Sequence, residues 1–148
     1  PEAERPVAPT RGDFATRVVR RHRAETRELE IAPNRSDVVL LDARSAEEYA
    51  GATPYLSPRG GHIPGARHLN WRDMLTPDGQ IHDREHLLKR LTERGVKPEQ
   101  RVIAYCTGGV RSAFVIAVLT HLGFSDVANY DGSWWDWSSQ PYLPIARP

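Results

Sequence analysis

The stretch RVIAYCTGGVRSAFVIAVLTHLG (101–123) contains the three patterns that decide the fold class of this chain. Residues 101–105 are mostly apolar, as expected of a strand covered on both faces in a parallel sheet. Residues 106–111 form a loop with two glycines. Residues 112–123 are apolar on nearly all sides and end at a glycine, which is typical of a deeply buried helix. A strand, a tight loop and a helix therefore follow one another here.

The same alternation extends along the chain. Four consecutive branched apolar residues (38–41) predict another strand covered on both faces, and Ser45 is expected to cap a short helix through Tyr49. Asp83 is expected to cap a helix that ends at Gly95. The other expected segments are a first strand over 14–19, a short helix over 24–31, a long loop over 51–65, a short strand and small helix within 66–71, a turn over 76–79, and a short strand with a turn and an aromatic segment over 126–137.

Strands that alternate with helices indicate an α/β domain with a mostly parallel sheet. The first thirteen residues contain three prolines and few apolar side chains. We therefore expect residues 1–13 to be an extended linker or arm, and residues 14–148 to be the folded domain.

The composition is that of an ordinary globular protein. At 148 residues the chain can bury a core, and its net charge of +1 does not point to a nucleic acid or a membrane as a partner. Its longest strongly apolar run, 113–119, is too short to span a bilayer. A single cysteine excludes an internal disulfide framework and is typical of a reducing compartment, so we expect a cytoplasmic protein. Because the chain begins at Pro1 rather than Met, a targeting signal or a further domain upstream stays open.

That cysteine, Cys106, follows the predicted strand 101–105 directly, at the sheet edge where ligands of α/β proteins collect. Gly108 and Gly109 let the backbone curl so that successive N–H groups point inward, and a thiol among them is favoured as thiolate. Arg111 adds a planar cation suited to a sulfonate or a phosphate. The loop is therefore predicted to hold an activated sulfur nucleophile beside an anion site.

A purely structural interpretation exists for each of these features. A lone cysteine after a buried strand is usually a small core residue, but the unit Cys-Thr-Gly-Gly-Val-Arg between a strand and a helix favours the functional interpretation. Asp42 and Arg44 end the neighbouring strand; for Asp42 we favour a buried ion pair, whereas Arg44 is a candidate for adding positive field near Cys106. His62 is interpreted as a structural loop residue, and Trp134, Trp135 and Trp137 as packing residues by default.

The segment HDREH (82–86) formally matches a zinc-peptidase motif that needs both histidines on one helix. With Asp83 as the helix cap, His82 falls outside the helix, so no metal site is expected there.

Four segments resemble, in order, those of the rhodanese (sulfurtransferase) family: LLDARSAEEYAG (40–51), GGHIPGARHLNW (60–71), YCTGGVRS (105–112) and YDGSWWDW (130–137). The resemblance extends from about Phe14 onward. It is strongest to the catalytic C-terminal half of two-domain thiosulfate or mercaptopyruvate sulfurtransferases, so a preceding inactive rhodanese domain is compatible with it.

The resemblance implies a parallel sheet of about five strands with helices on both faces, and no cofactor. It also implies a thiosulfate sulfurtransferase in which Cys106 takes sulfane sulfur as a persulfide. The partners are then a small anionic sulfur donor and a thiophilic acceptor such as cyanide or a thiol. The residues expected to bind substrate are Thr107, Gly108, Gly109, Val110, Arg111, Ser112 and Arg44.

The chain departs from the two-domain pattern at three positions. Thr107 stands where those enzymes carry Gly or Arg, Arg111 where they carry Thr, and Glu48 where they tend to carry an anion-binding Arg. These departures weaken a mercaptopyruvate assignment.

Rhodanese-fold phosphatases are an alternative. They place five residues between Cys and Arg, whereas this chain has four, a ring better sized for sulfur than for phosphate. A non-catalytic interaction domain is a second alternative, although such relatives commonly lack the cysteine. A redox role is disfavoured because the chain has no resolving cysteine.

Overall fold

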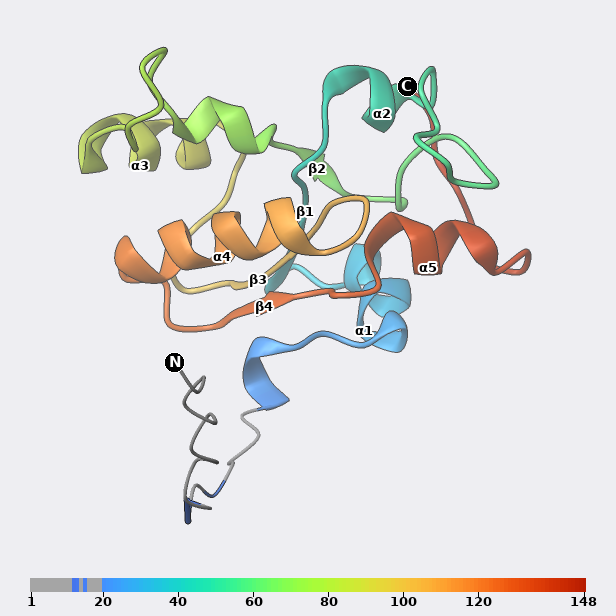
Figure 1. Cartoon of the computed structure of the whole chain (residues 1–148), viewed down its shortest axis with the longest axis horizontal. Coiled ribbons are helices and arrows are strands. Elements are labelled where there is room, and N and C mark those ends of the chain that lie inside the picture. Colours follow the sequence, from blue (N-terminus) through green and yellow to red (C-terminus); the bar gives the residue numbers. More distant parts are fainter. Residues whose placement is uncertain (1–11, 14, 16–19) are drawn as a thin grey trace, which may run out of the picture.

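The computed structural model describes residues 12–13, 15 and 20–148. These residues form an α/β domain whose four strands are all parallel, in the order β2-β1-β3-β4 (Figure 1). The strands are β1 (Val38–Asp42), β2 (Arg67–His68), β3 (Arg101–Tyr105) and β4 (Val127–Asn129). The fold class and both strands predicted from apolar runs are confirmed.

The number of strands in the described part is four rather than about five. Beyond β4 the chain continues the sheet with a single parallel bridge between Arg23 and Asn129, in which the Ala24 N–H donates to the Asn129 carbonyl at 2.9 Å. Glu25 directly after this bridge caps a helix, so the extended segment ends before it becomes a strand. The expected strand over 14–19 lies outside the described residues except for Ala15, as does most of the expected linker.

In the part of the chain that the structure describes, five α-helices and three 3-10 turns connect and cover the strands. The α-helices are α1 (Thr26–Ile31), α2 (Ala46–Ala50), α3 (Arg84–Glu93), α4 (Val110–His121) and α5 (Ser133–Ser139). The 3-10 turns are η1 (Arg20–His22), η2 (Ala32–Asn34) and η3 (Trp71–Met74).

The predicted caps are confirmed. The Ser45 hydroxyl accepts the Glu48 N–H at 3.3 Å, and the Asp83 carboxylate accepts the His86 N–H at 2.9 Å. Helix α4 begins two residues earlier than expected, because Gly109 adopts a φ of 88° and is itself the cap.

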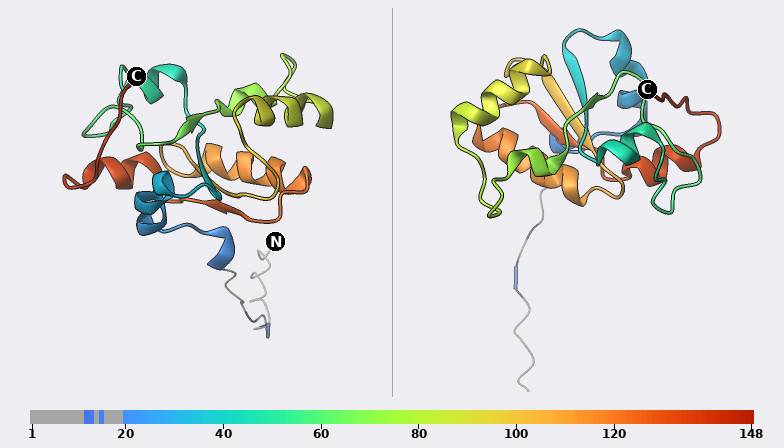
Figure 2. Two further views of the ribbon diagram at one scale, coloured as in Figure 1. Left: turned by 180° about the vertical axis from the view of Figure 1, so that it is seen from behind. Right: turned by 90° about the horizontal axis from the view of Figure 1, so that it is seen from above.

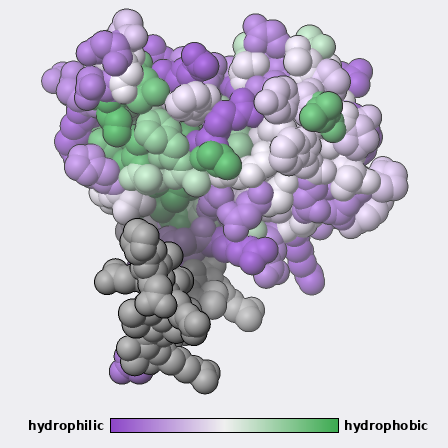
Figure 3. Space-filling view, viewed as in Figure 1, coloured by the Kyte–Doolittle hydropathy of each residue, from purple (hydrophilic) through white to green (hydrophobic). Residues whose placement is uncertain are grey.

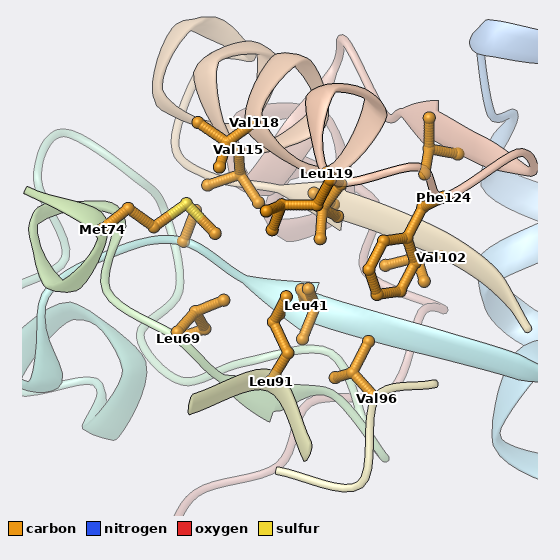
Figure 4. Packing of buried hydrophobic residues seen from close by; sticks show 14 of the residues in the cluster. Leu41, Leu69, Met74, Leu91, Val96, Val102, Val115, Val118, Leu119 and Phe124 are labelled. Carbon is orange, nitrogen blue, oxygen red and sulfur yellow. The ribbon is translucent and has the colours of Figure 1, made fainter. Parts of the chain in front are cut away.

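Alternation along the strands divides the interior into two cores, one on each face of the sheet. In β1 the side chains of Val39 and Leu41 pack with α3, α4 and η3, whereas Leu40 packs with α1 and α5. Figure 4 shows residues of the first core, with Val115 and Leu119 of α4 directed toward the strands. Figure 2 shows the sheet between these helical layers. Because both faces are covered, the strands are nearly continuously apolar.

The surface reflects the same arrangement. In Figure 3 hydrophobic surface gathers over α3 and α4, where Leu88, Phe114 and Ile116 are only partly buried against the first core. Within the described part of the chain, the helices are too short or too polar to cross a lipid bilayer.

The long loop 51–65 is held against the C-terminal segment rather than left free. The Arg59 guanidinium donates to four main-chain carbonyls around the end of α5, those of Trp137, Ser138, Gln140 and Leu143. His62 forms an isolated antiparallel bridge with Ala146. The loop therefore brings its outer residues, Tyr55 among them, to a defined place beside the β3–α4 loop.

Candidate active site

Two glycines allow the β3–α4 loop to curl around the cysteine. Gly109 has a φ of 88°, and a Cβ atom there would lie 2.7 Å from the carbonyl oxygen of Asp131. A Cβ atom on Gly108 would lie 2.6 Å from the indole ring of Trp135, which packs directly on the loop. Larger residues at either position would push the loop away from its neighbours.

The start of α5 clamps the same loop from the other side (Figure 1). The N–H groups of Trp134 and Trp135 donate to the carbonyls of Cys106 and Thr107, each at 3.0 Å. The Cys106 N–H donates to the Ser133 hydroxyl at 3.1 Å. These bonds fix the loop carbonyls on the side toward α5, which leaves the later N–H groups of the loop free to face the sulfur.

Cys106 is 1% exposed, and its sulfur is surrounded by hydrogen-bond donors. The Gly109 N–H lies 3.2 Å from Sγ and the Ser112 hydroxyl 3.6 Å from it. Burial by itself raises the pKa of the thiol. The Ser112 hydroxyl, the N–H groups of Ser112 and Gly108, and the charge of Arg111 outweigh that effect, so the pKa of Cys106 is lowered overall. The site therefore favours the thiolate, the nucleophilic form.

Arg111 does not point freely into solvent. Its two terminal nitrogens each donate to one oxygen of the Glu48 carboxylate at 2.8 Å. The Thr107 hydroxyl completes a triangle, since it donates to Glu48 at 2.7 Å and accepts a hydrogen bond from Arg111. Burial raises the pKa of the Glu48 carboxyl, but the bonds from Arg111, Thr107 and the Ser45 N–H lower it to about 2. The pair is therefore fully ionised at neutral pH.

A cavity of about 510 Å³ opens over the cysteine. Its walls come from the β3–α4 loop, α2, η3, the loop 51–65 and α5. Aromatic side chains and arginines are prominent among the lining residues, which are Ser45, Glu48, Tyr55, Asn70, Trp71, Arg72, Cys106, Thr107, Gly108, Val110, Arg111 and Trp135. A small anion can reach the sulfur through this opening.

Most of the predicted site residues converge at this cavity. Thr107, Gly108, Val110 and Arg111 line it together with Cys106. The other two predicted residues, Gly109 and Ser112 in the first turn of α4, donate hydrogen bonds to the sulfur.

Arg44 is not brought to the cavity. Its side chain is 1% exposed, it forms a two-point ion pair with Asp42, and its guanidinium also donates to the Gly61 carbonyl at 2.7 Å. The guanidinium lies over the Trp134 ring, 4.5 Å from its centroid. The contacts that support the loops occupy the donors of Arg44 in this arrangement, and a role of Arg44 in substrate binding stays a prediction. The ion pair expected for Asp42 is present.

His62 is buried, stacks on the Tyr49 ring at 3.7 Å and places Nδ1 3.0 Å from the Tyr49 carbonyl, which agrees with a structural role. Trp134 and Trp137 are fully buried, whereas Trp135 is 46% exposed at the cavity. His82 lies outside α3 and stacks on His86 at 3.9 Å. Among the described residues no group of three or more His, Cys, Asp or Glu side chains is placed to hold a metal ion.

Two residues outside the predicted set also contribute to the site. Glu48 departs from the family pattern, and its carboxylate holds Arg111. The Ser-x-x-Glu capping box over 45–48 is the sequence signal that places this carboxylate near the start of α2. Ser133 holds the Cys106 N–H and has a φ of 52°, which is uncommon for a residue other than glycine. No local sequence signal identified that role.

The family model of the rhodanese-like domain matches residues 25–140. This chain belongs to that family. The matched range includes every element of the rhodanese domain described above from α1 to α5, and it includes the whole cavity.

Curated proteins that are similar to this chain in sequence include thiosulfate sulfurtransferases. The chain is 34% identical over 110 residues to the thiosulfate sulfurtransferase of Azotobacter vinelandii, a match that covers 74% of this chain and 40% of that protein. It is 37% identical over 116 residues to the thiosulfate sulfurtransferase of Corynebacterium glutamicum, with 73% and 38% covered. The chain thus spans about two fifths of the length of these relatives.

Among solved structures, the fold resembles that of an anaerobic ergothioneine biosynthesis enzyme from Chlorobium limicola. The TM-score is 0.81 at 22% identity, over 86% of this chain and 32% of that one. This likeness supports the rhodanese fold.

Proposed function

We propose that this chain is a sulfurtransferase domain that moves sulfane sulfur from thiosulfate, through a Cys106 persulfide, to a thiophilic acceptor. The observation that carries the proposal is the environment of Cys106. A thiol with a lowered pKa sits at the base of a cavity, with N–H groups and a hydroxyl directed at its sulfur. The resemblance to thiosulfate sulfurtransferases supports the choice of donor.

In the first half-reaction the Cys106 thiolate attacks the outer sulfur of thiosulfate. A bond forms between Sγ and that sulfur, the sulfur–sulfur bond of thiosulfate breaks, and sulfite leaves with the electron pair. The charge of the persulfide falls near the inward N–H groups of the loop and the helix start behind it, which are suited to stabilise it. No general acid is needed, since sulfite leaves as an anion.

In the second half-reaction an acceptor such as cyanide attacks the outer sulfur of the persulfide. The new carbon–sulfur bond forms as the persulfide bond breaks, and Cys106 returns as thiolate to begin the next cycle. The same donors that stabilise the resting thiolate make it a good leaving group.

Intact-mass spectrometry after incubation with thiosulfate tests the proposal. The protein is expected to gain one sulfur atom, which cyanide removes, and Cys106→Ser is expected to gain none. Turnover of thiosulfate by Cys106→Ser at the normal rate would refute the assignment.

The spacing of four residues between Cys106 and Arg111 leads us to expect no appreciable hydrolysis of an aryl phosphate. Rapid phosphate release without any persulfide would instead support a phosphatase.

The natural donor is addressed by comparing thiosulfate with mercaptopyruvate on the intact chain. Glu48 stands where an anion-binding arginine is expected in the two-domain enzymes, and it neutralises Arg111, so we expect thiosulfate to be used in preference. We also infer a reducing, cytoplasmic setting, because the mechanism needs a free thiol. The greater length of the relatives supports a further domain in the full protein, which we propose to be an inactive rhodanese domain.

A further inference from the structure

Arg111, the cation that ends the Cys-Thr-Gly-Gly-Val-Arg unit, has its charge matched inside the protein. Both terminal nitrogens bind the Glu48 carboxylate, whose side chain is 8% exposed. Thr107 occupies one of the remaining donor directions. A donor that enters the cavity therefore meets a neutral ion pair at this wall. A cation without such a partner would add more to the attraction of an anion than this pair does.

Arg72 is such a cation. It lines the same cavity from η3, and its side chain is exposed. Among the described residues, its guanidinium forms no hydrogen bond or ion pair with another side chain or with the main chain. The guanidinium lies over the Trp71 ring, with Cζ 5.4 Å from the centroid, a contact that orients the fork without using its N–H donors.

The position of Arg72 is fixed by its surroundings rather than by its own side chain. Trp71 packs edge-on against Phe114 of α4 with ring centroids 5.9 Å apart, and the Trp71 N–H donates to the Ala43 carbonyl at 3.1 Å. Asn70 caps η3 by accepting the Arg72 N–H at 3.1 Å. These contacts dock η3 against α4, the helix that carries Arg111 in its first turn. The unpaired cation therefore lines the cysteine cavity from a docked 3-10 turn.

We propose that Arg72 binds the anionic end of the sulfur donor and that the site selects small, compact oxyanions such as the sulfonate of thiosulfate. This inference rests on the proposed function. The planar fork of Arg72 can take two oxygens of a sulfonate while the outer sulfur is directed to Cys106. The Glu48–Arg111 pair then orients the donor without adding net charge. Arg72 is a specificity-determining residue, separate from the nucleophile and its hydrogen-bond donors.

The first test separates the two half-reactions in Arg72→Gln. The apparent KM for thiosulfate is expected to rise about five- to tenfold, the loss expected for one exposed, charge-assisted contact. Transfer from the preloaded persulfide to cyanide is expected to stay within twofold of wild type. The KM of Arg72→Lys, which keeps the charge but not the planar fork, is expected to lie between those of wild type and Arg72→Gln. Arg27→Gln on α1 is the matched control, since this exposed arginine does not line the cavity.

The second test needs no sulfurtransferase activity. Cys106 is alkylated with anionic iodoacetate and with neutral iodoacetamide, and the ratio of the two rates is compared. Any change in the thiolate itself affects both reagents equally, so the ratio reports the attraction of anions. Arg72→Gln is expected to lower the ratio of the iodoacetate rate to the iodoacetamide rate about threefold. This reduction is expected to be smaller at high salt, because salt screens the charge of Arg72 in wild type. Arg27→Gln is expected to leave the ratio unchanged.

The outcomes distinguish the two proposals. If wild type forms no persulfide, the sulfurtransferase assignment fails whatever Arg72 does. If wild type forms the persulfide but Arg72→Gln has a normal KM and a normal alkylation ratio, the inference about Arg72 fails alone. That result would indicate that Arg72 serves only the second cavity that it borders, which is lined on its other side by α3 residues including His86 and Arg90.

Discussion

Replacing Glu48 by glutamine tests the ion pair that holds Arg111. The pKa of the Glu48 carboxyl is about 2, against an ordinary value of 4.5. At about 1.4 kcal/mol per pH unit, this difference corresponds to about 3 kcal/mol of folding free energy at neutral pH. The Glu48 side chain is 8% exposed but that of Arg111 is 27% exposed, so solvent screens the pair in part. Losses of about 3–5 kcal/mol are typical when a fully buried pair is broken, and the lower end of that range applies here. Glu48→Gln should therefore lower the free energy of unfolding by about 3 kcal/mol.

The same reasoning gives the pH dependence. The folded-state pKa lies below the unfolded-state value, so the stabilisation is fully present above pH 4.5 and is lost as the pH falls toward 2. The difference in stability between wild type and Glu48→Gln should therefore be constant from about pH 8 to pH 5. It should shrink to roughly half by about pH 3, provided that both proteins remain folded there.

Urea denaturation monitored by tryptophan fluorescence measures the loss of stability in Glu48→Gln and its dependence on pH. Glu47→Gln is the matched control, because Glu47 lies in the same first turn of α2 but is exposed. Its effect should be much smaller. Glutamine at position 48 can still accept the Ser45 N–H, so the comparison isolates the charge rather than the helix cap. A loss below 1 kcal/mol at pH 7, or a loss that does not change at acidic pH, would show that the Glu48–Arg111 pair does not contribute as argued.

Three further predictions concern the loop. Ser112→Ala removes the hydroxyl that lies 3.6 Å from Sγ, so the pKa of Cys106 should rise. The pH profile of alkylation by iodoacetamide should shift to higher pH, and the rate at pH 7 should fall roughly three- to tenfold. An unchanged pH profile would contradict this. Gly109→Ala adds a Cβ atom 2.7 Å from the Asp131 carbonyl at a φ of 88°, whereas Gly79→Ala has a similar φ of 83° but open space around it. Gly79→Ala should cost about 1 kcal/mol of stability and Gly109→Ala about 2–3 kcal/mol together with most of the persulfide formation; equal costs in thermal unfolding would mean that crowding against Asp131 is unimportant. Arg111→Lys should keep only part of the sulfurtransferase activity, because lysine cannot bind both Glu48 oxygens. Arg111→Ala should slow persulfide formation more than it lowers stability. Equal losses of folding and activity would show that Arg111 is structural.

The sequence by itself determined the features that depend on neighbouring residues. The strands Val38–Asp42 and Arg101–Tyr105 were predictable because burial on both faces requires a continuous apolar run. The caps at Ser45 and Asp83 were predictable because a side-chain oxygen reaches the backbone only two or three positions away. The position of Cys106 at the end of a strand, followed by glycines, likewise followed from the order of residues.

The tertiary structure decided which charges meet. Glu48 and Arg111 are 63 positions apart, and only the parallel pairing of β1 with β3 brings their following segments to the same edge of the sheet. The ion pair with Glu48 neutralises Arg111, the arginine expected to bind the donor. Arg44 is likewise paired with Asp42. Arg72, which is exposed, lines the cavity without such a partner among the described residues. The clamp on the loop, formed by the Ser133 hydroxyl and the N–H groups of Trp134 and Trp135, also depends on this packing, because local sequence does not show which distant backbone groups these donors and acceptors meet. Charged side chains pair with whatever partner the packed fold places within a few ångströms, and that distance is not encoded in local pattern.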